Sequence, residues 1–149
     1  MHSRWNRSRK PVSLPLQLYY LKETYPGSTG QISSTSMQWS CWIQPSPITN
    51  RYRFDLRYQL GKTPASYVME PNLSALAPER ELPHMYDQST YKLCLYQPAY
   101  KEWLPHLLIA RTIVPWAVMW FYYFELWLVT DVWSGNGEHP AVPALSRGG

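Results

Sequence analysis

The clearest pattern in the chain is a regular alternation of hydrophobic and polar residues between positions 51 and 60. The hydrophobic positions are Tyr52, Phe54, Leu56, Tyr58 and Leu60, and the polar positions are Arg51, Arg53, Asp55, Arg57 and Gln59. Successive side chains of a strand point to opposite faces of a sheet, so this alternation predicts a strand with one buried and one solvated face. A second alternation, at Met37, Trp39, Cys41 and Ile43, predicts another half-buried strand with the Cys41 thiol on its buried face.

Shorter segments complete the predicted order of elements around these two strands. Ser13 suits the N-cap of a helix over residues 14–24, and a proline in the first turn agrees with this start. Short segments at 31–33 and 67–69 predict two further strands, one on each side of the longer pair. The four strands together form a predicted antiparallel meander. Mainly loop is expected between residues 71 and 90.

A second helix is predicted over residues 112–130, and it contains an uncharged run at 113–124. A membrane-spanning helix needs about twenty apolar residues, whereas Arg111 and Glu125 close this run, so we judge it too short to span a bilayer. Large apolar residues recur at steps of three or four, as on the buried face of a helix: Ile113, Trp116, Trp120, Phe124 and Trp127. We therefore expect a core helix and no membrane span, and we assign the opposite face, with Tyr122 and Glu125, to a protein partner.

Length and charge favour a single domain with a basic N-terminal tail. A chain of 149 residues is enough for one ordinary domain. Its formal net charge is +4, and four Arg and Lys residues stand in the first ten positions, which contain no acid. A nucleic-acid-binding protein spreads its basic residues over a folded face, so this cluster predicts a solvated tail and no nucleic-acid partner. We divide the chain into a basic flexible tail (1–12), one folded domain (13–140) and a flexible C-terminal tail (141–149).

Cysteines and histidines are too few and too scattered to predict a metal site or a disulfide framework. The chain has two cysteines, Cys41 and Cys94, and four histidines, without the paired spacing of a zinc site. No metal or other cofactor is therefore predicted. The apolar segment after the basic cluster is interrupted by prolines and a glutamine, so it lacks the continuous apolar run of a secretion signal. We expect a cytoplasmic protein with reduced thiols.

Cys94 lies in a setting that is similar to a known active site. His84 stands ten residues before it, in Leu82-Pro83-His84, and Trp103-Leu104-Pro105 begins nine residues after it. This layout resembles the ubiquitin-conjugating enzymes, in which a histidine precedes the nucleophilic cysteine and a Trp-x-Pro segment follows it. The resemblance implies an α+β ubiquitin-conjugating (UBC-like) fold, with an N-terminal helix, a four-stranded antiparallel meander, an active-site loop and a C-terminal aromatic helix. It also implies acyl transfer, because a cysteine can carry an acyl group as a thioester and pass it on.

The C-terminal part of the chain narrows the resemblance to bacterial proteins. An aromatic helix containing Glu125-Leu126-Trp127-Leu128 is followed by Trp133-Ser134-Gly135-Asn136-Gly137-Glu138-His139-Pro140. These segments are similar to the ubiquitin-conjugating-like proteins encoded with cGAS-like nucleotidyltransferases in bacterial CBASS anti-phage operons. The resemblance implies that Cys94 accepts the C-terminal glycine of the nucleotidyltransferase as a thioester. The protein would then prime that enzyme, or conjugate it to a target lysine, and raise its synthesis of a cyclic nucleotide signal.

The resemblance also implies a role for each site residue. Cys94 is the predicted nucleophile, whereas Cys41, on the buried face of a strand, is structural. His84 could act as a base toward a thiol or an amine. In the family the equivalent histidine mainly braces the loop, and we favour that role here. Trp103 and Pro105 are expected to hold the cysteine loop against the sheet, and Tyr86 is a third residue of the predicted active-site scaffold.

The segment after His84 departs from the family pattern. Eukaryotic conjugating enzymes place an asparagine there, whose amide stabilises the oxyanion of the tetrahedral intermediate. This chain has Met85 and Tyr86 instead, so the oxyanion would need a backbone N–H near Cys94, the Tyr86 hydroxyl or the Gln88 amide. Ligation to lysine depends on such a donor, while thioester formation needs only the cysteine and an activated C-terminus.

Two other functions stay open on the sequence alone. The first is an adaptor in which the fold is kept but Cys94 is silent, and the aromatic helix holds the nucleotidyltransferase. The second is a thiol hydrolase in which Cys94 and His84 form a dyad, with Asp87 as a nearby residue that could orient the histidine.

Overall fold

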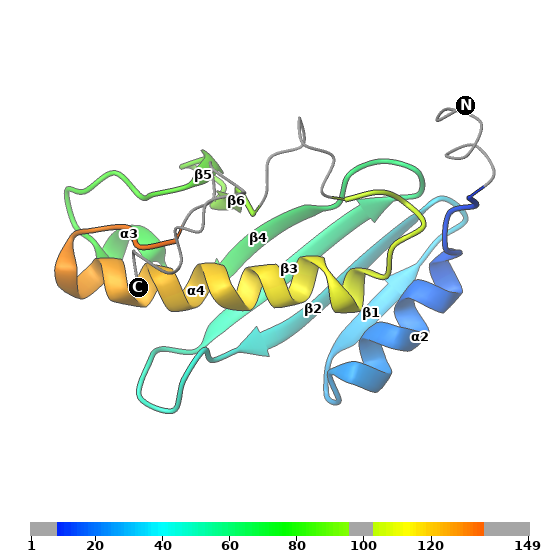
Figure 1. The fold of residues 1–149 in the computed structure, drawn as a ribbon, viewed down its shortest axis with the longest axis horizontal. Coiled ribbons are helices and arrows are strands. Elements are labelled where there is room, and N and C mark those ends of the chain that lie inside the picture. The colour runs from blue at the N-terminus through cyan, green and yellow to red at the C-terminus, as the bar shows by residue number, and fades with distance from the viewer. Residues whose placement is uncertain (1–8, 96–102, 136–149) are drawn as a thin grey trace.

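The computed structural model describes residues 9–95 and 103–135, and it has an N-terminal helix, an antiparallel sheet and a C-terminal helix (Figure 1). Its elements are α2 (Leu14–Thr24), β1 (Thr29–Ile32), β2 (Ser36–Ile43), β3 (Tyr52–Gln59), β4 (Ala65–Glu70), α3 (Leu73–Leu76), β5 (Met85–Asp87), β6 (Lys92–Leu93), the 3-10 helix η2 (Ile109–Arg111) and α4 (Ile113–Thr130). The predicted α+β class is confirmed. The predicted C-terminal tail (141–149) and most of the basic tail (1–12) lie outside the described residues.

The sheet extends beyond the predicted four-stranded meander. Strands β1 to β4 pair in sequence order, as predicted, and the sheet continues in the order β4-β6-β5. The expectation of mainly loop between residues 71 and 90 is confirmed, although the short elements α3 and β5 also lie there. Both are too short to produce a hydrophobic period; α3 is a single turn capped by Asn72, whose Oδ1 accepts a hydrogen bond from the Ala75 amide at 3.0 Å. Strand β6 ends at Leu93, so Cys94 follows directly from the sheet.

Helix α2 has the predicted bounds, with a capped first turn and an anchored inner face. The Ser13 hydroxyl accepts a hydrogen bond from the Leu16 amide at 3.3 Å. Gln17 is fully buried. Its Nε2 donates to the Leu107 carbonyl and its Oε1 accepts from the Ile109 amide, each at 2.9 Å. A polar side chain therefore joins α2 to the segment that leads into α4.

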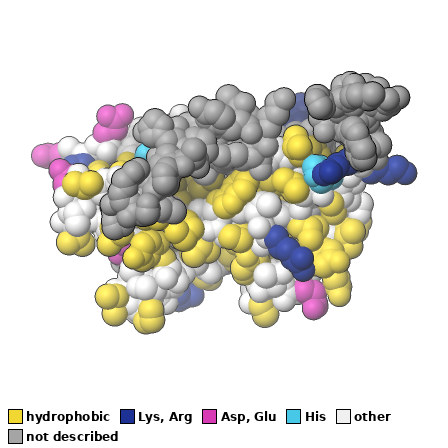
Figure 2. Space-filling model, in the orientation of Figure 1, with side chains coloured by type: hydrophobic (Ala, Val, Ile, Leu, Met, Phe, Trp, Pro, Cys, Tyr) yellow, Lys and Arg dark blue, Asp and Glu magenta, His cyan; other side chains and the backbone are white. Residues whose placement is uncertain are grey.

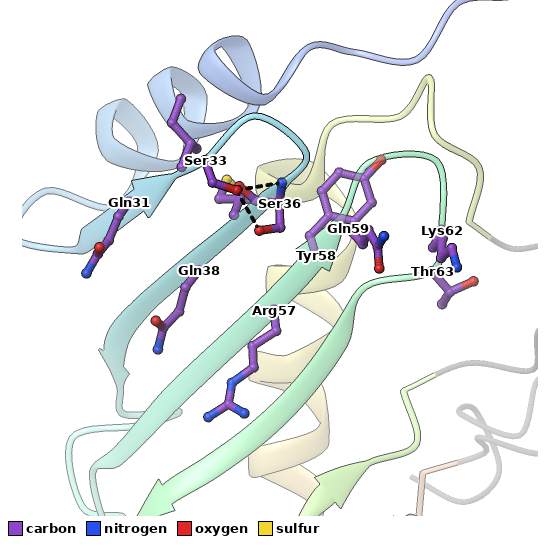
Figure 3. Close-up of a pocket in the computed structure, with 11 residues that line it drawn as sticks. Gln31, Ser33, Ser36, Gln38, Arg57, Tyr58, Gln59, Lys62 and Thr63 are labelled. Atoms are coloured by element: carbon purple, nitrogen blue, oxygen red, sulfur yellow. Dashed lines mark hydrogen bonds between the residues drawn. The ribbon is translucent and has the colours of Figure 1, made fainter.

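Both long helices pack on one face of the sheet, and the view from the other face shows α4 behind the strands (Figures 1 and 3). The buried side chains of β2 and β3 include Trp39, Tyr52, Phe54, Leu56 and Tyr58. The predicted alternation of β3 holds except at two positions. Leu60 is 39% exposed, because β3 ends at Gln59. Asp55 is only 3% exposed, and its carboxylate accepts hydrogen bonds from Gln38 Nε2 at 3.0 Å and from Arg57 Nε at 2.9 Å.

Helix α4 crosses the sheet and supplies much of the aromatic core (Figure 1). Its buried residues are Ile113, Val114, Ala117, Trp120, Phe121, Phe124 and Trp127. Phe121 stacks on Tyr52 of β3 with ring centroids 4.4 Å apart, and Trp120 stacks on Phe124 at 5.1 Å. The predicted core face is confirmed except at Trp116, which is only partly buried. Figure 2 shows that the surface on this side of the molecule is also rich in hydrophobic side chains.

Length and composition alone would allow this helix to cross a membrane. The segment Ile109–Thr130 has 22 residues and is long and apolar enough to do so, so the judgement that the run is too short is wrong. The core helix of a soluble protein passes the same test. Here the buried side of α4 contacts the sheet, where Phe121 and Phe124 both pack on Tyr52. That α4 is a core helix and not a membrane span stays our prediction.

Glu125 does not belong to a free partner-binding face, and that part of the prediction is wrong. Its carboxylate accepts hydrogen bonds from the Asn50 amide at 3.2 Å, from Asn50 Nδ2 at 2.9 Å and from the Tyr52 hydroxyl. Burial raises the pKa of Tyr52, and the hydrogen bond to Glu125 raises it further. The carboxylate therefore holds α4 to the start of β3, while Tyr122 on the same helix is 42% exposed.

Candidate active site around Cys94

Backbone hydrogen bonds place Cys94 beside His84. The Cys94 amide donates to the His84 carbonyl at 3.0 Å, next to the paired strands β5 and β6. His84 has a left-handed backbone with a φ of 48°, a conformation that costs about 1 to 2 kcal/mol in a residue other than glycine. The same carbonyl accepts a second hydrogen bond, from Trp120 Nε1 at 3.1 Å. Two donors therefore stabilise this unusual conformation and connect the cysteine to α4.

Cys94 and His84, the two residues predicted to be catalytic, line one small cavity. Its volume is about 170 Å³, and its walls are His84, Cys94, Leu95, Trp116, Met119, Trp120, Tyr123, Trp133 and Gly135. The His84 ring packs on the Trp133 ring with centroids 4.7 Å apart. Burial raises the pKa of Tyr123, so its hydroxyl is protonated at neutral pH. The structure thus brings the predicted nucleophile and the histidine to a single site.

Trp103 and Pro105, the predicted scaffold residues, are not walls of this cavity and instead hold the chain that leads into α4. Trp103 is buried, its Nε1 donates to Thr112 Oγ1 at 3.0 Å, and its ring meets the Tyr58 ring edge-on at 5.5 Å. The Pro105 carbonyl accepts a hydrogen bond from the Val12 amide at 3.0 Å. Trp103 thus contacts both the sheet and the start of α4. Val12, which we placed in the basic tail, contacts the domain through Pro105.

Tyr86 and Gln88, the two side chains considered as oxyanion donors, are not among the described walls of the cavity of Cys94, and Tyr86 was also predicted to belong to the active-site scaffold. Tyr86 is on β5, is about half exposed and lines a different cavity along β6. The Gln88 amide is bound to the Leu82 backbone: its Nε2 donates to the carbonyl at 2.8 Å, and its Oε1 accepts from the amide at 3.0 Å. Gln88 therefore closes the loop that carries His84.

The two cysteines of the chain lie in opposite environments. Cys41 is 7% exposed on the buried face of β2, and burial raises the pKa of its thiol to about 12, although the charge of Arg53 opposes the shift. Cys94 is only partly buried and lines a cavity, and neither cysteine forms a disulfide. The thiolate is the nucleophilic form of a cysteine. Cys94 is therefore the better candidate nucleophile, and Cys41 has the environment of a core residue.

Asp87, the residue considered for a thiol-hydrolase triad, is engaged in its own turn. The Ser89 hydroxyl at 2.8 Å and the Ser89 amide at 2.9 Å both donate to its Oδ1, and these bonds lower the pKa of the carboxyl. Asp87 is not a wall of the cavity that Cys94 and His84 line. Within residues 9–95 and 103–135, no group of three His, Cys, Asp or Glu side chains could hold a metal ion.

Sequence reasoning missed the side of the site that α4 provides. Trp116, Met119, Trp120 and Tyr123 all line the cavity, and their i, i+3, i+4, i+7 spacing puts them on one face of the helix. We had assigned two of these residues to the core alone. The sequence did contain a signal for this second contact. Besides the apolar residues that face the sheet, α4 has this additional row of apolar residues, and a helix with two such rows packs against more than one neighbour.

A larger cavity, of about 560 Å³, lies near the ends of β2 and β3 (Figure 3). Gln38 and Arg57 contribute to its walls, and their side chains project from the face of the sheet opposite α4. It shares no wall residue with the cavity of Cys94, and none of its described walls is a cysteine or histidine. Size alone would favour it as a binding site, but the predicted nucleophile Cys94 lines the smaller cavity.

Comparison with known protein families finds one family that matches most of the chain. A family model, E2-CBASS, described as Type II CBASS E2 protein, matches residues 17–140. A search of curated proteins found no match. The matched residues include Cys94 and every described wall of its cavity, together with the whole sheet and α4. The chain therefore belongs to the family of type II CBASS E2 proteins.

Proposed function

We propose that the protein, as a ubiquitin-conjugating fold, carries the C-terminus of a cGAS-like nucleotidyltransferase as a thioester on Cys94. The main support is the contrast between two thiols in a CBASS E2 protein: Cys41 is buried, while Cys94 lines a cavity with His84. The order of helix, meander, cysteine segment and aromatic helix is the one expected for a conjugating fold. Membership of a CBASS family makes the nucleotidyltransferase of the same system the expected partner.

The chemistry requires an activated donor, because a free carboxylate does not acylate a thiol. The donor C-terminus would arrive as an acyl adenylate or as a thioester. The Cys94 sulfur attacks the carbonyl carbon, a carbon–sulfur bond forms, and the bond to the adenylate oxygen or to the leaving thiol breaks. The thiol proton passes to solvent or to a nearby base. An amine, such as a lysine of a target protein, then takes the acyl group and regenerates the thiol.

His84 serves this chemistry mainly as a support for the backbone. Its carbonyl accepts hydrogen bonds from the Cys94 amide and from Trp120, at 3.0 and 3.1 Å. Neither bond depends on the protonation state of the imidazole. A general base would instead exchange a proton during the reaction, so the pH dependence of acylation distinguishes the two roles.

The proposal also implies a reducing compartment. A thiol that forms a thioester must remain reduced, and neither Cys41 nor Cys94 is in a disulfide. We therefore propose that the protein acts in the cytoplasm, where thiols are kept reduced. The reaction calls for no membrane, nucleic acid or metal ion.

Incubation of the chain with the nucleotidyltransferase of its operon, supplied with its C-terminus activated as a thioester of a small thiol, tests the proposal, with intact-mass analysis and non-reducing gels as readouts. The wild-type chain should form an adduct that a reducing thiol releases. Cys94→Ala should abolish the adduct, Cys41→Ala should keep it, and Cys94→Ser should form an oxyester that resists the reducing thiol. If Cys94→Ala still forms a thiol-sensitive adduct, the assignment of the nucleophile is wrong.

Two further outcomes distinguish the alternative functions. Deleting the last residues of the nucleotidyltransferase should remove the covalent species but spare a complex that survives gel filtration. A complex without any adduct, even for the wild-type chain, would favour a silent adaptor. Conversion of the activated C-terminus to free acid, dependent on Cys94, would favour a thiol hydrolase.

A further inference from the structure

The cavity at the candidate active site is apolar where α4 forms its wall. Trp116, Met119, Trp120 and Tyr123 supply this side. None of the described walls is a Lys, Arg, Asp or Glu. A charged group that entered would lose hydration, and His84 is the one described wall besides Cys94 and Tyr123 that could carry a charge opposite to it. The cavity therefore favours an uncharged, apolar occupant.

The size of the cavity matches one side chain. Its volume is about 170 Å³, and an apolar protein cavity of roughly 150 Å³ holds one benzene molecule. A branched aliphatic or aromatic side chain fits this space. A longer peptide segment does not, so such a segment would have to lie outside and insert a single side chain.

The walls are held in place before any ligand arrives. Trp120 donates to the His84 carbonyl at 3.1 Å, and the Trp133 ring packs on the rings of His84 and Trp120, with centroids 4.7 and 5.6 Å apart. At Gly135 an added Cβ atom would stand 2.7 Å from the Tyr123 ring, so the backbone there passes directly against α4. A preformed cavity costs less free energy to fill than one that a ligand must open.

The position of the cavity indicates which residue occupies it. Cys94 is one of the walls, so any acyl group bonded to its sulfur starts at the cavity. In the proposed function the terminal residue of the donor is glycine or similarly small, because a bulky residue would obstruct the approach of the carbonyl carbon to the sulfur. Such a residue cannot fill the space. The side chain immediately before it is the next that can reach the cavity.

We propose that this cavity is a specificity subsite for the penultimate residue of the acyl donor, and that it takes a leucine- or phenylalanine-sized apolar side chain. The proposal rests on the proposed thioester at Cys94. Full burial of such a side chain strengthens binding about ten- to a hundredfold. Because the subsite adjoins the sulfur, the gain should be measurable as faster acylation of Cys94 when the donor is dilute.

Helix α4 offers a matched pair of positions for a test. Met119 is a wall of the cavity and is 45% exposed, so a polar replacement at this position is compatible with folding. Tyr122 is 42% exposed on the same helix and is not a wall. The same charge introduced at the two positions therefore differs mainly in whether it reaches the cavity.

The test uses the full chain and short peptides activated as thioesters of a small thiol. The peptides end in Leu-Gly, Ala-Gly or Asp-Gly, and intact mass follows acylation of Cys94, during which the leaving thiol takes up the proton of the Cys94 thiol. We expect the Leu-Gly peptide to react about tenfold faster than the Ala-Gly peptide, and the Asp-Gly peptide to react slowest. Met119→Glu should remove the preference for leucine, and Tyr122→Glu should keep it.

The outcomes separate the subsite from the underlying chemistry. Equal rates for the three peptides, or a leucine preference that survives both Met119→Glu and the uncharged Met119→Gln, would overturn the subsite and leave thioester formation intact. If every peptide acylates the wild-type chain no more than it acylates the Cys94→Ala variant, the proposed function fails, and the subsite fails with it. Melting temperatures of the Met119 variants check that each protein is folded.

Discussion

The Trp120 indole nitrogen donates a hydrogen bond to the His84 carbonyl at 3.1 Å, and this contact joins the aromatic core to the candidate active site. On the core side, Trp120 stacks on Phe124 with ring centroids 5.1 Å apart. On the active-site side, the same His84 carbonyl accepts the Cys94 amide at 3.0 Å. The position of Cys94, the proposed nucleophile, therefore depends on how α4 packs.

Shortening the Trp120 side chain should reduce both stability and acyl transfer. Trp120→Ala removes a buried aromatic group and should lower the free energy of unfolding by roughly 3 to 5 kcal/mol. Trp120→Phe keeps a ring in the core but leaves the His84 carbonyl with one donor fewer, a loss of about 1 kcal/mol, and it should slow acylation of Cys94. Denaturant unfolding and the peptide-thioester reaction measure the two effects. An unchanged melting temperature for Trp120→Ala would contradict the core-helix assignment.

The left-handed backbone of His84 allows its two possible roles to be separated. Asparagine adopts this conformation more readily than most residues, so His84→Asn should keep the carbonyl in place while it removes the imidazole. We expect this variant to acylate Cys94 at a rate within a few-fold of wild type, with a pH–rate profile of the same shape. A drop of about a hundred- to ten-thousandfold, together with the loss of one ionisation from the profile, would show that His84 is a general base.

Glu125 should matter to stability much more than its exposed neighbour Tyr122. Glu125→Ala leaves the Asn50 amide groups and the Tyr52 hydroxyl without their acceptor, and we expect a loss of about 1 to 3 kcal/mol in the free energy of unfolding. Tyr122→Ala should cost no more than about 1 kcal/mol. Denaturant titration of both variants gives the comparison. Equal losses would mean that the carboxylate does not hold α4 to β3.

The regular elements were predictable because burial on one face imposes a period on the sequence. Helix α2 begins and ends where the sequence predicts, and β3 follows its alternation except at Asp55 and Leu60. The alternation predicts that every residue on the polar face of β3 is exposed to solvent. Asp55 is buried there instead, because the side chains of Gln38 and Arg57 cover it and donate hydrogen bonds to its carboxylate. Strand β5 and helix α3 have three and four residues, too few for any period to show.

The candidate site was only partly predictable. Cys94 and His84 lie together, as expected from the family resemblance, in which a histidine precedes the cysteine by about ten residues. The contribution of α4 to the cavity could not be inferred from that spacing. Trp116 and Trp120 share one period along α4, yet only Trp120 is buried in the core, and tertiary packing decides the difference. The partners of Gln17 stand 90 and 92 residues further along the chain. No local pattern contains that information.

Cys41 should make the stability of the protein fall at alkaline pH. Burial raises the pKa of its thiol from 9.0 to about 12. Between these values the unfolded chain loses the thiol proton while the folded protein keeps it, so rising pH favours unfolding. Burial and Glu125 raise the pKa of Tyr52 as well, and this shift acts in the same direction. We therefore expect the melting temperature to decrease as the pH rises from about 9 toward 12.

Cys41→Ala tests the origin of this effect, because the variant lacks the thiol that must stay protonated. Its melting temperature should fall less steeply than that of the wild type over the same range, and Tyr52→Phe should reduce the remaining slope. The same burial predicts that iodoacetamide near neutral pH alkylates Cys94 but not Cys41. The Cys94→Ala protein should therefore gain an alkyl group only in denaturant, as mass spectrometry can show. Rapid alkylation of folded Cys94→Ala would mean that Cys41 is accessible, and it would remove the contrast between the two thiols on which the choice of nucleophile rests.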